Sequence, residues 1–132
     1  MAIKVVVLDS RLLPTGVDFP PLDADKYGWE QYPQLQGEDI AERCWRADIV
    51  VSLDSAISAL EIEKMVKIGL LVCAGPACER VDQAAVAARG VELLAFPEAQ
   101  YGTSTDAQDL CDRVVAAINH YIRNYEAGGV AI

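Results

Sequence analysis

The chain has 132 residues, of which 52% are hydrophobic and 23% charged, with only 6 Pro and 9 Gly. This composition is typical of a globular protein and excludes a disordered or repeat protein, and the length predicts a single domain over residues 1–132. The formal net charge of −9 repels phosphate backbones, so we expect no nucleic acid partner.

The N-terminal segment and the cysteines indicate a cytoplasmic protein. The apolar run after Met1 meets Asp9 too early for a signal peptide, and no apolar run approaches the ~18 residues that cross a bilayer. Four widely spread cysteines favour free thiols over a metal site, since the single His120 lies on another segment. They are Cys44, Cys73, Cys78 and Cys111. We therefore expect no membrane contact and no metal.

The first half of the chain begins with a buried strand. Residues 3–9 are a β-branched apolar run, as in a strand covered on both faces of a parallel sheet. Prolines break regular structure over 11–25 and allow at most a short helix near 22–26. Residues 28–33 alternate weakly and predict an edge strand, and acids followed by Arg predict an amphipathic helix over 37–47.

The second half alternates strands with helices. Three buried strands are predicted at 48–53, 69–74 and 91–96. Ser58 and Glu61 have the spacing of a capping box and open a helix through about Lys67. A second helix over 81–89 is closed by Gly90, the left-handed residue expected past a helix end.

A long helix is predicted over residues 104–125. Its apolar stripe keeps helical spacing over roughly four turns. The stripe is Leu110, Val114, Ala117, Ile118, Tyr121, Ile122 and Tyr125. At ~1.5 Å per residue this helix spans roughly 30 Å, whereas six-residue strands span about 20 Å, so it should overhang the sheet.

These elements predict an α/β three-layer sandwich. Its parallel five-stranded sheet is expected to be flavodoxin-like, with strand order 2-1-3-4-5 and a long C-terminal helix. In such sheets ligands bind beyond the carboxyl ends of the strands, near the switch point between the first and third strands.

The turn after the strand at 69–74 is the candidate binding site. Free backbone N–H groups and the positive end of a helix dipole would face one space there, which favours a carboxylate or phosphate. The candidate residues are Gly75, Pro76, Ala77, Cys78 and Arg80. The alternative is an ordinary strand-to-helix turn in which Asp82 supports the first helical turn.

This order of segments resembles the substrate-binding domain of the D-isomer-specific 2-hydroxyacid dehydrogenases, such as glycerate and phosphoglycerate dehydrogenases, over residues 3 to about 125. The family pattern runs G-x-G-x-x-N-V-D, A-A-x-x-G-I, N-x-P, a Tyr/Thr loop and V-A-E-H. Gly75, Val81-Asp82, 87–91 and Pro97 match it, and 101–103 fit the loop.

The departures concern side chains that carry chemistry in the family. Ala77 stands for the second glycine, while Arg80 and Ala95 each replace an asparagine. The V-A-E-H segment corresponds to 106–109 and has no histidine.

The resemblance implies that a small 2-oxo or 2-hydroxy acid binds the main-chain amides of 75–78. It also implies that the NAD site and the catalytic arginine, glutamate and histidine belong to a second domain. We expect that domain to be absent, because no G-x-G-x-x-G occurs and His120 falls in mid-helix. No catalytic residue is therefore assigned, and the chain alone should bind no NAD and be inactive as a dehydrogenase.

Two functions stay open. The chain is either an acid-binding or interaction module without independent catalysis, or a subunit or fragment of an NAD-dependent 2-hydroxyacid dehydrogenase completed by another chain, which would then supply NAD binding. In both cases the outer face of the long helix seeks a partner, so we expect a homodimer through residues 105–125.

Three other functions fit less well. Asp9 and Asp54 follow strands as in phosphoacceptor receiver domains, but Ala74 ends the fourth strand where a Ser or Thr should follow, and Phe96 takes the place of the lysine before the last proline. A flavin site needs a phosphate loop after the first strand, which does not occur. Cys78 near a helix N-terminus is a candidate reactive thiol.

Overall fold

The computed structural model describes residues 2–35 and 37–131, with side chains as far as residue 125. Five parallel strands form one sheet in the order β2-β1-β3-β4-β5. They are β1 (Ile3–Leu8), β2 (Tyr27–Tyr32), β3 (Ile49–Ser52), β4 (Leu70–Ala74) and β5 (Glu92–Phe96). The predicted α/β class, flavodoxin-like strand order and long C-terminal helix are confirmed.

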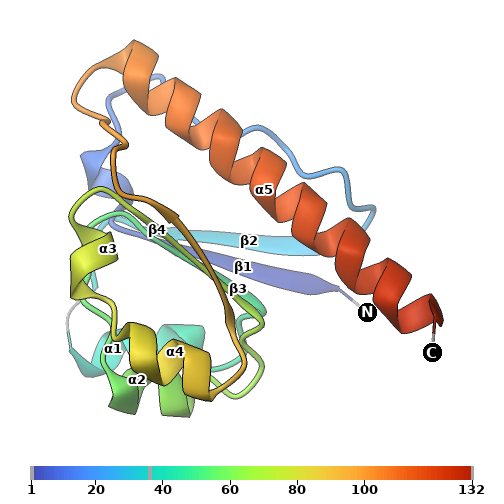
Figure 1. Ribbon diagram of the computed structural model, residues 1–132. Helices are drawn as coiled ribbons and strands as arrows, with labels where there is room; N and C mark the ends of the chain where they lie inside the picture. The colour runs from blue at the N-terminus through green and yellow to red at the C-terminus, as the bar shows by residue number, and fades with distance from the viewer. Residues whose placement is uncertain (1, 36, 132) are drawn as a thin grey trace.

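Helices cover the sheet on both faces (Figure 1). One face carries α1 (Glu38–Cys44), α2 (Ala59–Lys64) and α4 (Gln83–Ala88), and the other carries α5 (Ser104–Ala131). The four-residue helix α3 (Ala77–Arg80) lies at the carboxyl edge of the sheet (Figure 1).

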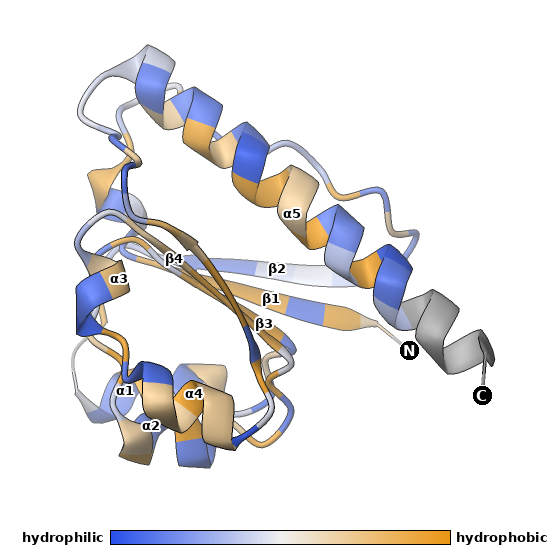
Figure 2. Cartoon of the chain, viewed as in Figure 1, coloured by the Kyte–Doolittle hydropathy of each residue, from blue (hydrophilic) through white to orange (hydrophobic). Residues whose placement is uncertain are grey.

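The core consists of two apolar layers, because successive side chains of a strand point to opposite faces. Val6 and Leu8 of β1 pack with α1, α2 and α4, whereas Val5 and Val7 pack with α5. Both layers reach complete burial at β1, β3 and β4, which are the strands in the middle of the sheet. Figure 2 shows that these strands are mostly hydrophobic. The apolar runs of the sequence therefore correspond to a sheet covered twice.

The segment between β1 and β2 has little regular structure. The prolines allowed at most a short helix near 22–26, and none forms there, while a 3₁₀ helix, η1 (Ser10–Leu12), follows β1. The backbone amides of residues 22 and 23 donate to side chains of other elements. The Leu22 amide donates to the Tyr27 hydroxyl (3.2 Å), and the Asp23 amide donates to the Asn119 side chain (3.0 Å). The first bond ties the segment to β2 and the second ties it to α5.

The helices between the strands are shorter than predicted. α2 has the expected Ser58–Glu61 capping box but ends at Lys64, where the Arg89 guanidinium binds the carbonyls of Ile62 and Met65. The helix predicted over 81–89 is shortened to α4, because Val81 forms a parallel bridge with Ile57. The separate short helix α3 precedes that bridge.

Helix α5 overhangs the sheet as predicted. It has 28 residues, whereas the strands have four to six, and at ~1.5 Å per residue it spans roughly 40 Å. Figure 1 shows its C-terminal end extending past the strands. Ile118 and Ile122 of the predicted stripe are buried, but Tyr125 is 66% exposed. In the part of the chain that the structure describes, no helix is long and apolar enough to cross a membrane.

Candidate functional site

Asp9 fixes the loop that follows β3. It comes directly after β1, has a left-handed backbone (φ 69°) and is 1% exposed. Its Oδ2 accepts the amides of Asp54 (2.9 Å) and Ser55 (2.7 Å), and its Oδ1 accepts the Ser55 hydroxyl (2.8 Å). These bonds satisfy a buried carboxylate and set the position from which the Asp54 side chain leaves the backbone.

The Asp54 carboxylate lies between two arginines from different elements. Arg80 Nη1 of α3 is 2.5 Å from Oδ1 and 3.1 Å from the Asp54 carbonyl oxygen. Arg11 Nη2 of η1 is 3.6 Å from Oδ2. Each carboxylate oxygen therefore faces its own guanidinium at the surface of the protein.

A hollow of about 380 Å³ opens beside this ion-pair group. Its charged lining residues are Asp9, Arg11, Asp54, Glu61 and Arg80. It lies where β1 meets β3, which is the switch point of the 2-1-3-4-5 order. The carboxyl edge thus offers a concave surface with two cationic side chains at the position where open α/β sheets bind ligands.

The predicted binding turn is tightly packed. Gly75 has a left-handed φ of 54°, and its amide donates to the Phe96 carbonyl at 3.0 Å. Pro76 has no N–H, and the Cys78 amide donates to the Gly75 carbonyl at 3.2 Å. The Ala77 amide is the remaining main-chain N–H of this turn; it lies at the start of α3, and Ala77 is fully buried.

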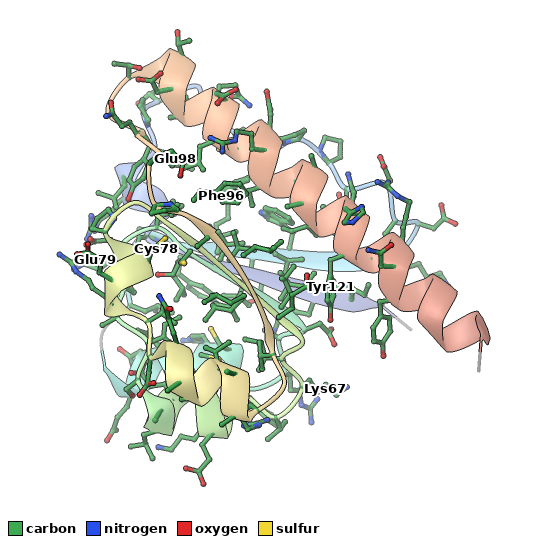
Figure 3. All side chains as sticks on the ribbon, in the orientation of Figure 1. Lys67, Cys78, Glu79, Phe96, Glu98 and Tyr121 are labelled. Carbon is green, nitrogen blue, oxygen red and sulfur yellow. The ribbon has the colours of Figure 1, made fainter. Side chains whose placement is uncertain are left out.

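The five candidate residues separate into an inner and an outer group. Gly75, Ala77 and Cys78 are buried, whereas Pro76 and Arg80 are exposed. Of the five, Arg80 reaches the hollow described above. Figure 3 shows Cys78 and Glu79 on α3, with Lys67 and Tyr121 at the opposite end of the sheet.

Tyr101 closes the turn from the loop before α5. Its hydroxyl donates to the Leu53 carbonyl and would lie 2.8 Å from a Cβ added to Gly75. Burial, followed by the nearby Asp54 and Asp9 charges, raises the pKa of Tyr101, which keeps the phenol protonated. The loops after β3, β4 and β5 are therefore joined through one side chain.

The cysteine side chains near this turn, Cys73 and Cys78, are buried. Burial, and after it a hydrogen bond with Cys78, raises the pKa of Cys73 to about 12. Cys78 itself is 5% exposed. A buried cysteine is poorly placed to react with a solvent-borne substrate, so the thiol hypothesis gains no geometric support.

Neither the G-x-G-x-x-G pattern nor a cluster of possible metal ligands occurs among the described residues. No G-x-G-x-x-G turn occurs in the sequence, so the chain does not fit the NAD-binding pattern. Among the residues that the structure describes, no group of three His, Cys, Asp or Glu side chains could hold a metal ion. His120 lies roughly 24 Å along α5 from Ser104, where its Nε2 contacts the Asn124 side chain at 3.0 Å.

Comparisons with known proteins show the fold. No family model and no curated protein matches the chain. Among solved structures, NAD⁺-bound 3-phosphoglycerate dehydrogenase from Entamoeba histolytica is similar, with a TM-score of 0.54 and 19% sequence identity. The match covers 72% of this chain and 33% of that chain. The chain therefore spans about a third of the length of that enzyme.

Arg11 and Glu61 are the site residues that sequence reasoning missed. Arg11 lies in the proline-rich segment, where the sequence pattern predicts little regular structure. The capping box already accounted for the presence of Glu61. A signal for Arg11 exists: it stands two residues beyond the end of the first strand, at the edge where ligands bind.

Proposed function

We propose that the chain is a relative of the D-2-hydroxyacid dehydrogenase substrate domain that binds a small 2-oxo or 2-hydroxy acid without independent catalysis. The observation that carries this proposal is the position of Arg80, whose guanidinium stands beside a hollow at the switch point of the sheet. The fold likeness to a 3-phosphoglycerate dehydrogenase supports it. The Ala77 amide and the Gly75–Cys78 turn are the proposed main-chain part of the site.

A thermal-shift screen of 2-oxo and 2-hydroxy acids tests this function. We expect millimolar D-glycerate, D-lactate or pyruvate to raise the melting temperature, because a ligand that binds only the native state stabilises it. Arg80→Gln should abolish the rise, and NADH should add nothing. If no acid in the screen changes the melting temperature, the protein does not bind such acids.

A second candidate function follows from the partial coverage of the dehydrogenase by the structural match. Because the match covers 33% of that enzyme, the chain is alternatively one part of an NAD-dependent 2-hydroxyacid dehydrogenase, completed by a nucleotide-binding chain or domain. NADH-dependent reduction of pyruvate or hydroxypyruvate that needs both this chain and a cell extract would favour this function. Turnover by the extract alone at the same rate would exclude it.

The compartment proposed for the protein is the cytoplasm. All four cysteines are buried and free, which supports a reducing environment.

A further inference from the structure

We propose that the hollow at the switch point binds a singly charged small carboxylate between Arg11 and Arg80, and that the Asp54 side chain occupies the ligand's place in the unliganded protein. This inference deepens the proposed function and rests on it. It adds Arg11 to the site, gives Asp54 the role of a competitor within the protein, and specifies that the ligand carries one negative charge.

The two arginines are held independently of the carboxylate that they share. The Arg80 carbonyl accepts the Ile57 amide (3.2 Å), beside the bridge between Ile57 and Val81. Arg11 belongs to η1, and its amide donates to the Pro33 carbonyl at 3.4 Å. Both backbones therefore stay in place when the Asp54 side chain moves.

Asp54 has a fixed backbone and a carboxylate at the surface. Its amide is bound to the buried Asp9, but its side chain is 30% exposed and bonded to arginines that are themselves 36% and 50% exposed. Ion pairs at such exposure contribute little to stability. Rotation of the Asp54 side chain therefore costs little free energy. It frees two guanidinium groups that are spaced for the two oxygens of one carboxylate.

The charges around the hollow limit the ligand to a monoanion. Three carboxylates, Asp9, Asp54 and Glu61, line the same hollow as the two arginines. A phosphate monoester with a carboxylate brings about three negative charges to this surface, whereas an unphosphorylated 2-hydroxy acid brings one. Like-charge repulsion at short range thus selects the unphosphorylated acid.

The test uses the full chain and follows the arginine Nε–H resonances by NMR during titration with D-glycerate and with 3-phosphoglycerate at constant ionic strength. Asp54→Asn should bind D-glycerate about fivefold more tightly than the natural chain, because a competing exposed ion pair is removed. In the Asp54→Asn background, Arg11→Gln and Arg80→Gln should each lose at least that gain. The natural chain should bind 3-phosphoglycerate more weakly than D-glycerate.

Asp25→Asn is the matched control, since it removes the same charge from an exposed residue just before β2, at the opposite edge of the sheet. Equal D-glycerate affinity in Asp54→Asn and Asp25→Asn would overturn the role of Asp54 and leave the proposed function standing. Tighter binding of 3-phosphoglycerate than of D-glycerate would overturn the inference that the ligand is a monoanion. Binding in Asp54→Asn but not in the natural chain would support the competitor role while contradicting the proposed function, and binding in neither would contradict both.

Discussion

Asp9 and Ser55 are joined by two hydrogen bonds, because the Asp9 carboxylate accepts both the Ser55 amide (2.7 Å) and the Ser55 hydroxyl (2.8 Å). This pair ties the end of β1 to the loop after β3 at the switch point of the sheet. The site therefore depends on a buried acid that itself has no surface for a ligand.

Asp9→Ala should reduce the free energy of unfolding by about 3 kcal/mol, because it leaves two partly buried amides without an acceptor and puts alanine in a left-handed conformation. Asp9→Asn should cost about 1 kcal/mol, since asparagine tolerates that backbone and keeps one acceptor oxygen. Urea unfolding at pH 7 measures both. Equal losses in the two variants would show that the carboxylate bonds do not stabilise this loop.

Gly75→Ala should destabilise the protein by about 2 kcal/mol or more, because the residue has a positive φ and the new Cβ would lie 2.8 Å from the Tyr101 hydroxyl. In a Tyr101→Phe background the same change should cost less, since the closest atom is gone. Comparing the four urea midpoints gives the coupling. Strict additivity would mean that backbone strain alone explains the glycine.

Local sequence patterns predicted the sheet and much of its surroundings. The apolar runs predicted the three middle strands and β5, and Ser58 with Glu61 predicted the start of α2, because these signals act within a few residues. The C-terminal end of α2 depends on Arg89, about 25 positions further along the chain. The path of 20–26 depends on Asn119, which lies 96 positions from Asp23. Such contacts leave no local pattern.

The site shows the same limit. The turn at Gly75–Arg80 was located from sequence, but the amides of Gly75 and Cys78 bond within the fold and Arg80 faces Asp54. That pairing joins residues 26 positions apart, and Arg11 reaches it from a third element. Sequence could predict the edge of the sheet and not which side chains meet there.

Three buried thiols should make the protein sensitive to alkali. Burial raises the pKa of Cys44, Cys73 and Cys111 from 9.0 to about 12. Above pH 9 the unfolded chain loses these protons while the native protein keeps them, so the free energy of unfolding falls as pH rises toward 12. Each thiol contributes up to about 1 kcal/mol per pH unit in that window, and the contribution grows as pH rises above 9.

Urea unfolding between pH 8 and 10.5 measures this slope. Cys111→Ala should make the slope shallower, by up to about 1 kcal/mol per pH unit at the alkaline end of this range, whatever its effect on stability at pH 8. An unchanged slope in this variant would mean that Cys111 ionises as readily in the native state as in the unfolded chain.

The end of α5 carries the surface through which we expect two copies to associate. Tyr121 and Tyr125 stack with their ring centroids 6.2 Å apart beside a cleft of about 490 Å³ that also includes Ile3 and Ile68. Tyr125 is 66% exposed, and exposed aromatic side chains are frequent anchors of protein interfaces. We therefore predict a homodimer that uses residues 105–125.

Light scattering and sedimentation velocity at high protein concentration test this dimer. Tyr125→Glu should weaken association at least tenfold, because truncating an interface anchor costs about 1 to 2 kcal/mol or more and the new charge would be buried against its copy. Leu60→Glu introduces the same charge at a 60% exposed position on α2, on the other face of the sheet, and should leave the dimer intact. A monomer at every concentration, or equal loss in both variants, would place the contact elsewhere or remove it.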